Sequence, residues 1–144
     1  MRNRRAILAL VVLCLVGLTL AARLWLESGP PRVTTLALTT QIDPATKAPR
    51  TTLEDFPPGT KVMYAVVKVK NPRRGTRVES KWYFDRYGTG RYGLVDSSFV
   101  TFPDRRDRYV AFSLAAQETF PPGTYKVSIL VDGQVALERE FRVR

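Results

Sequence analysis

The sequence predicts an all-β protein in which about seven strands form a two-sheet sandwich, preceded by one N-terminal hydrophobic helix. Three observations lead to this prediction. After Leu26, no window of ten or more residues carries a clean helical stripe. Several windows alternate apolar and polar residues with a period of two instead. Clusters of proline, glycine, asparagine and aspartate separate those windows, as turns between strands do.

The N-terminal segment has the pattern of a membrane anchor. Residues 1–5 carry three arginines and no acidic residue, and residues 6–22 are 17 residues without a charge. As a helix, this run is about 25 Å long, and the residues up to Leu26 extend it towards the ~30 Å of a hydrocarbon core. We therefore expect residues 1–26 to be an uncleaved signal-anchor helix in the cytoplasmic membrane, with the arginines inside and the remaining chain outside.

Three other interpretations apply to this segment. A cleaved signal peptide has the same basic start and apolar run, and would leave a secreted or periplasmic protein. A lipoprotein modified at Cys14 is disfavoured, because Leu13 stands where a small residue is needed. A buried core helix is also disfavoured, because a run without a polar face needs burial on all sides.

The strands are expected after a short linker. Residues 27–32 (ESGPPR) form this stiff, proline-containing spacer, and residues 33–144 form the β domain. Residues 41–58 are expected to be a long loop or an irregular edge. Asp132-Gly133 predicts a two-residue hairpin turn. The expected strands are residues 33–40, 62–70, 77–84, 98–102, 109–114, 124–131 and 135–143.

Two sequence features resemble those of an immunoglobulin-like domain of the bacterial type. Trp82 lies in the third expected strand, and Gly123-Thr124-Tyr125-Lys126-Val127 opens the sixth. The resemblance covers residues 62–143 and implies a tyrosine corner at Tyr125. It places Val127 where many family members have a disulfide cysteine, so this bridge is absent here. The resemblance concerns architecture and implies no activity.

A short repeat precedes two of the expected strands. Phe56-Pro57-Pro58-Gly59-Thr60 recurs as residues 120–124. Its flanking residues do not repeat, which favours a recurring strand-entry turn over a duplicated half-domain.

The composition excludes most catalytic sites. The chain has no histidine and one cysteine, which removes histidine-dependent triads, cysteine zinc sites and an intrachain disulfide. Asp104 and Asp107 are interleaved with arginines, which favours local ion pairs over calcium binding. Gly88-Thr89-Gly90 lacks the lysine spacing of a phosphate loop. No carboxylate is paired with another in a catalytic arrangement, Glu54, Asp55, Asp85 and Asp96 included. We therefore predict a non-enzymatic protein with no cofactor or metal.

Positive charge is the main functional signal. Residues 61–91 contain nine basic and two acidic residues, so this window holds +7 of the net charge of +10. Strand alternation and the intervening turn predict one basic patch, with Tyr83, Tyr87 and Tyr92 beside it. An ordinary solvated face, or lysines that discourage edge aggregation, would give the same pattern. The candidate patch consists of Lys68, Lys70, Arg73, Arg74, Arg77 and Lys81.

These features lead to two functional hypotheses. The first is a membrane-anchored extracytoplasmic binding module that contacts a protein or an anionic envelope component through the basic patch. The alternative is a structural accessory subunit of a larger membrane complex, with the N-terminal helix as its main contact. Basic residues among aromatics also suit single-stranded nucleic acid, but the predicted compartment argues against that partner.

Overall fold

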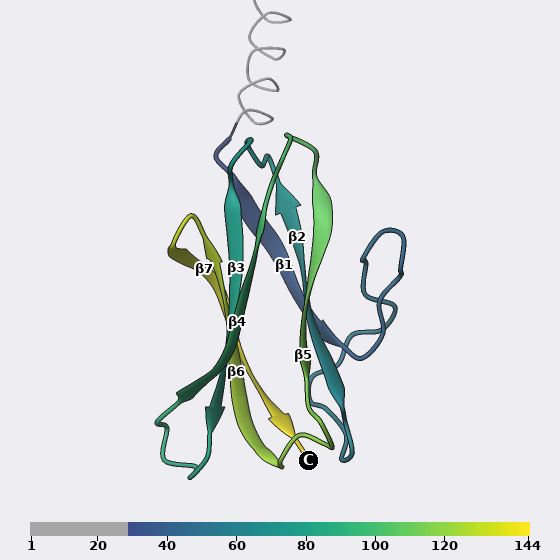
Figure 1. The fold of residues 1–144 in the computed structure, drawn as a ribbon, viewed down its shortest axis with the longest axis vertical. Helices are drawn as coiled ribbons and strands as arrows, with labels where there is room; N and C mark the ends of the chain where they lie inside the picture. Colours follow the sequence, from purple (N-terminus) through teal and green to yellow (C-terminus); the bar gives the residue numbers. More distant parts are fainter. Residues whose placement is uncertain (1–28) are drawn as a thin grey trace, which may run out of the picture. The chain divides into compact units, whose positions relative to one another are not determined.

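The computed structural model describes residues 29–144, which contain seven strands and no helix (Figure 1). The chain is therefore all-β over this range, as predicted. The expected signal-anchor helix at residues 1–26 lies outside the described residues. No segment of residues 29–144 forms a helix that could traverse a bilayer. The strands are β1 (Arg32–Thr39), β2 (Val62–Lys70), β3 (Arg77–Asp85), β4 (Gly93–Thr101), β5 (Arg108–Ala115), β6 (Gly123–Val131) and β7 (Gln134–Val143).

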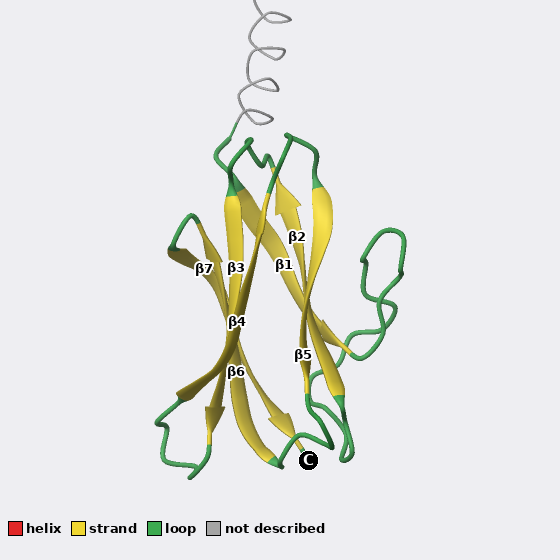
Figure 2. Cartoon of the chain, in the orientation of Figure 1, coloured by secondary structure: helices red, strands yellow, loops and turns green. Residues whose placement is uncertain are grey.

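The strands form two sheets that pack as layers (Figure 2). One sheet has the order β1-β2-β5 and the other has the order β4-β3-β6-β7, and every neighbouring pair is antiparallel. The chain changes sheets between β2 and β3, between β4 and β5, and between β5 and β6. Such crossings are typical of immunoglobulin-like sandwiches.

Alternating side chains fill the space between the sheets. On β2, Met63, Ala65, Val67 and Val69 are each 0% exposed, while the residues between them face outwards or are less buried, apart from Val66. The inward residues of β5 are Val110, Phe112 and Leu114, and those of β6 include Val127 and Ile129. The inward faces expected from the period-two pattern of these strands are confirmed.

Two aromatic side chains confirm the immunoglobulin-like character of the fold. Trp82 of β3 is 0% exposed and lies edge-on to Phe141, with 6.2 Å between ring centroids. The Tyr125 hydroxyl donates a hydrogen bond of 2.8 Å to the Pro121 carbonyl, four residues upstream. This is the tyrosine corner that the resemblance implied. Aromatic packing around Tyr125, rather than a disulfide, ties β6 to its neighbours, because residues 29–144 contain no cysteine.

Two local expectations have different outcomes. The hairpin turn at Asp132-Gly133 is confirmed, since both residues have positive φ angles, 49° and 84°, as a type I′ turn requires. The fourth strand begins at Gly93, not at Ser98 as expected. Eight of its nine residues are exposed, so the first half of the strand has no apolar–polar alternation to reveal it.

The two copies of the Phe-Pro-Pro-Gly-Thr repeat have different local structures. Gly59 has a φ of 81° and open space around it, whereas Gly123 has a φ of 150° and lies against the Phe84 ring. The copies meet where the Phe120 amide donates to the Thr60 carbonyl, at 3.0 Å. These differences favour two strand-entry turns over a duplicated half-domain.

Candidate anion-binding surface

The predicted basic patch is divided by the change of sheet between β2 and β3. Lys68 and Lys70 lie on the outer face of the β1-β2-β5 sheet. Lys81 lies on the outer face of the other sheet, where its Nζ atom is 4.0 Å from the Oε1 atom of Glu79. The prediction that Lys81 shares a surface with these two lysines is therefore wrong. The period-two pattern assigns a side chain to one side of its own strand, but it does not assign the strand to a sheet.

The tyrosines expected beside the patch are also elsewhere. Tyr83 lies on the outer face of the four-stranded sheet, with the Lys126 ammonium 5.3 Å from its ring centroid. Tyr87 and Tyr92 belong to the β3–β4 loop, at the end of the sandwich opposite to the β2–β3 loop (Figure 1).

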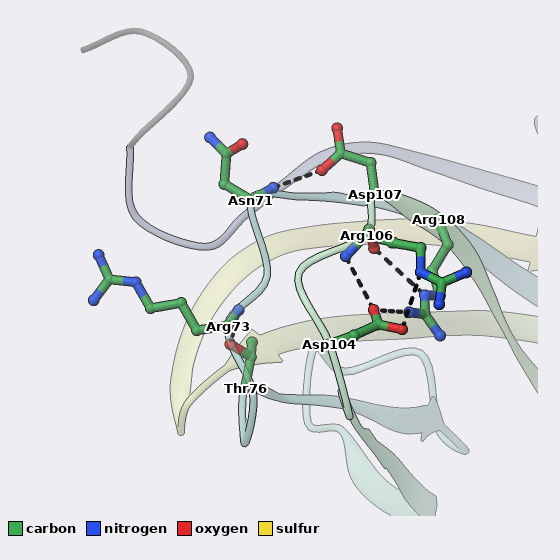
Figure 3. A network of polar contacts seen from close by, with 7 residues as sticks. All are labelled: Asn71, Arg73, Thr76, Asp104, Arg106, Asp107 and Arg108. Carbon is green, nitrogen blue, oxygen red and sulfur yellow. Dashed lines mark hydrogen bonds and ion pairs between the residues drawn. The ribbon is translucent and has the colours of Figure 1, made fainter. Parts of the chain in front are cut away.

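The structure brings Arg73, Arg74 and Arg77 together with arginines that are distant in sequence. The β2–β3 loop, residues 71–76, lies beside the β4–β5 loop, residues 102–107 (Figure 3). The Gly75 amide donates a 2.8 Å hydrogen bond to the Phe102 carbonyl, and the Phe102 amide donates a 2.9 Å hydrogen bond to the Thr76 carbonyl. The start of β1 joins the same end, because Arg32 pairs with Lys70. The basic residues of this surface, which we call the arginine end, are Arg32, Lys70, Arg73, Arg74, Arg77, Arg105, Arg106 and Arg108.

Local hydrogen bonds fix the loop that carries Arg73 and Arg74. The Arg73 amide donates to the Thr76 hydroxyl at 2.8 Å, and the Thr76 amide donates to the Arg73 carbonyl at 2.9 Å. Thr76 is buried, Gly75 has a φ of 88°, and both arginines are exposed. Figure 3 shows Arg73 extending away from the network around Asp104. The backbone of this loop is therefore ordered, while its guanidinium groups face solvent.

Asp104 organises the neighbouring loop. It accepts a 3.0 Å hydrogen bond from the Arg106 amide and forms ion pairs with the side chains of Arg106 and Arg108. The Arg106 amide, followed by the Arg108 side chain, lowers the pKa of Asp104 below its usual value. Local ion pairing is thus confirmed for Asp104. Asp107 instead accepts a hydrogen bond from the Asn71 amide, at 2.8 Å. Residues 29–144 contain no cluster of three or more metal-ligating side chains.

The arginine end keeps an excess of positive charge. It has eight basic residues against four acidic ones, Asp104, Asp107, Asp132 and Glu79, whose carboxylate lies 3.6 Å from the Arg77 guanidinium. The Asp132 carboxylate accepts a hydrogen bond from the Arg77 amide. Within the described part of the chain, Arg73, Arg74 and Arg105 form no ion pair. Guanidinium groups of this kind suit phosphate and carboxylate ligands.

The predicted patch lacks Arg32, Arg105, Arg106 and Arg108 of the arginine end, although the sequence contains a signal for them. In a sandwich of alternately directed strands, every second connection lies at the same end. The β2–β3 and β4–β5 loops therefore share an end with the start of β1. This inference requires only the number of strands, which is seven as expected, although β4 begins earlier than expected.

A second feature lies at the opposite end, around the β3–β4 loop. The buried Asp85 carboxylate accepts hydrogen bonds from the amides of Tyr87, Thr89 and Gly90. Burial alone would raise the pKa of Asp85, but these amides outweigh it and hold the pKa below its usual value. The ordered loop borders an open pocket of about 890 Å³, whose lining includes Arg86 and Arg91.

Comparison with known proteins identifies no family for this chain. No family model and no curated protein matches the chain. An immunoglobulin-like protein from Pseudomonas aeruginosa has a TM-score of 0.49 and 11% identity, over 81% of this chain and 98% of that one. A Pseudomonas fluorescens alkylpurine DNA glycosylase bound to DNA has a TM-score of 0.46 and 13% identity, over 79% of this chain. A Listeria innocua β-glucosidase in complex with gluconolactone has a TM-score of 0.48 and 13% identity, also over 79% of this chain.

The chain spans 30% of the glycosylase and 16% of the glucosidase. Similarity at this level carries no argument about activity or ligand. The immunoglobulin-like description therefore depends on the strand order, Trp82 and the tyrosine corner of the chain itself.

Proposed function

We infer that this protein is a membrane-anchored, extracytoplasmic binding module, and that its arginine end contacts a phosphate-bearing component at the membrane surface. The observation that carries this inference is the place where the N-terminal segment joins the domain. Arg32, the first residue of β1, belongs to the arginine end. The segment expected to enter the membrane is therefore connected to the most basic part of the sandwich.

The linker length limits how far the arginines can lie from the expected anchor. Between Leu26 and Arg32 the chain can extend by at most about 20 Å. Electrostatic attraction decays over ~8 Å at physiological ionic strength. Basic residues near an anionic bilayer contribute about 1 kcal/mol each. The short linker thus allows several arginines to reach that range together.

Four of the twelve side-chain carboxylates of residues 29–144 support a non-enzymatic role. Asp43, Asp55, Asp85 and Asp104 each accept hydrogen bonds from backbone amides, and these bonds lower the pKa of each carboxyl group. Groups held in this way cap turns or bind a neighbouring strand. They remain ionised and do not serve as proton donors near neutral pH.

Vesicle binding tests the proposed contact. All seven strands and the core lie between Arg32 and Val143, so residues 29–144 contain the complete folding unit. We expect this fragment to sediment with vesicles that contain phosphatidylglycerol and not with pure phosphatidylcholine vesicles. The triple variant R73E/R74E/R105E should bind about a hundredfold more weakly, because three arginine contacts are lost.

The matched control reverses the same number of charges elsewhere. Lys47, Arg50 and Lys61 are exposed in the connection between β1 and β2. If K47E/R50E/K61E weakens vesicle binding as much as the first triple variant, net charge alone drives binding and the proposed site is wrong. A reporter fused after Arg144 tests the location separately, and activity only in the cytosol would refute the extracytoplasmic assignment.

A further inference from the structure

Strand β4 forms one edge of the four-stranded sheet and is unusually apolar for an edge. No other strand of residues 29–144 pairs with its free side. Leu94, Val95, Phe99 and Val100 are 59%, 48%, 56% and 40% exposed. Asp96 is the only charged residue of the strand. An exposed edge of this kind is a template for pairing with another polypeptide.

The other sheet edges are protected. β7 carries Glu138, Arg139, Glu140 and Arg142 in its second half, and Val135 is its one exposed large hydrophobic residue. The Leu53 amide donates to the Leu38 carbonyl of β1, so the β1–β2 connection covers part of that edge. β5 has no exposed large hydrophobic residue. The apolar free edge is therefore specific to β4 among the described strands.

Both faces of β4 offer contacts to an added strand. Phe99 pairs with Glu79 on the outer face of the sheet, and the Arg77 guanidinium carbon lies 3.7 Å from the Phe99 ring centroid. Val100 pairs with Val78, whose side chain belongs to the core, and so lies on the other face. Cross-strand apolar pairs of this kind contribute roughly 0.2–1 kcal/mol each.

Positive charge lies at both ends of β4. Its first residues, Gly93 and Leu94, line the pocket that contains Arg86 and Arg91. Its last residue, Thr101, pairs with Arg77 of the arginine end. If a second copy paired antiparallel with β4, the Arg86 end of one copy would face the Arg77 end of the other. Positive charges would then face each other at both ends of the strand pair and disfavour this dimer.

We propose that β4 is the docking edge for an extended segment of another polypeptide. This segment has alternating apolar residues that continue the sheet and acidic residues at both ends. Main-chain hydrogen bonds to β4 supply affinity, and the apolar faces and the arginines at each end supply specificity. The β3–β4 register shifts at Val95, so the regular part of β4 is residues 96–101, six residues that accommodate a strand of about 20 Å. This surface shares Arg77 with the arginine end, but the proposed strand pairing does not require a membrane contact.

The probe for this proposal is a fluorescein-labelled synthetic peptide of alternating valine and threonine, with glutamates at both ends. We expect it to bind the full chain in nonionic detergent, measured by fluorescence anisotropy. Bound peptide should slow amide hydrogen exchange across residues 93–101, which a merely sticky surface would not do. A peptide with lysines at both ends should bind at least about tenfold more weakly.

Neutral substitutions separate β4 from general hydrophobic binding. V95S/F99S removes two exposed apolar contacts and should weaken binding about tenfold. The matched control is Val135→Ser, because Val135 is 61% exposed on β7 at the opposite edge. This control should bind the peptide normally.

Several results would overturn the proposal. They are absence of peptide binding, equal weakening by Val135→Ser, and unchanged exchange in residues 93–101. A dimer of the free chain that V95S/F99S abolishes would show that a second copy occupies the edge. Because none of these measurements uses vesicles, their failure is distinguishable from failure of the proposed membrane contact.

Discussion

The hydroxyl of Tyr125 provides a quantitative test of the fold. This hydroxyl donates to the Pro121 carbonyl at 2.8 Å, and the side chain is 2% exposed. The ring stacks on Phe84 and Phe141, with centroid distances of 4.5 and 5.7 Å. Tyr125→Phe removes the hydrogen bond and keeps these ring contacts, so it isolates the contribution of the tyrosine corner.

The expected cost of Tyr125→Phe follows from the surroundings of the acceptor. A hydrogen bond contributes about 1 kcal/mol net, and an acceptor left buried costs more, about 1–3 kcal/mol. Pro121 is an exposed residue and the hydrogen bond is only partly buried, so the acceptor is not left in the dry core. We therefore expect a loss of about 1 kcal/mol, which corresponds to a fall in Tm of about 4 °C for a domain of this size. Tyr125→Ala also removes the ring and should cost about 3–5 kcal/mol.

Urea unfolding measures both variants. Trp82 is the one tryptophan within residues 29–144 and is fully buried, so its fluorescence reports on the core of this fragment. If Tyr125→Phe is as stable as the unsubstituted fragment, the hydroxyl contributes nothing and the reasoning is wrong. If it costs as much as Tyr125→Ala, the ring contacts were not preserved and the assignment also fails.

Three further changes follow from local geometry and charge. Burial raises the pKa of Tyr92 and of Tyr125 to about 12. The stability that these neutral hydroxyls contribute is therefore present below pH 10 and is lost as the pH rises from about 10 to 12. Urea unfolding midpoints measured at stepped pH should fall in that window. Gly123→Ala places a Cβ 2.8 Å from the Phe84 ring and should lower the Tm by several degrees, whereas an unchanged Tm would refute the close packing. Asp85→Asn should weaken the acid dependence of stability, because a lowered pKa gives stability above pH 3.8 that is lost as the pH falls; an identical acid unfolding curve would contradict this role.

Strand positions were predictable where burial imposes a pattern. Met63 to Val69 alternate clearly because one face packs in the core. Asp132-Gly133 identified its turn, because few residue pairs accept two positive φ angles. Tyr125 was assigned by resemblance, and its hydrogen bond confirms the assignment.

The surfaces were less predictable because they depend on tertiary arrangement. Lys81 is separated from Lys70 by a change of sheet that no local pattern records. Arg105 lies beside the β2–β3 loop only because two connections meet at one end of the sandwich. The first half of β4 was missed because both of its faces are exposed, so no alternation distinguishes it from a loop.

The positions of Arg32 and Val143 have a mechanical consequence. β1 enters one sheet at the arginine end, and β7 leaves the other sheet at the opposite end (Figure 1). Tension between these two points runs along the strands, whereas the hydrogen bonds between strands lie perpendicular to them. The force therefore shears all hydrogen bonds of the β1–β2 and β6–β7 ladders together instead of opening them one at a time. Resistance to pulling is then set by the barrier to unfolding. A domain held at its first strand and pulled from its last can transmit force along its length while staying folded.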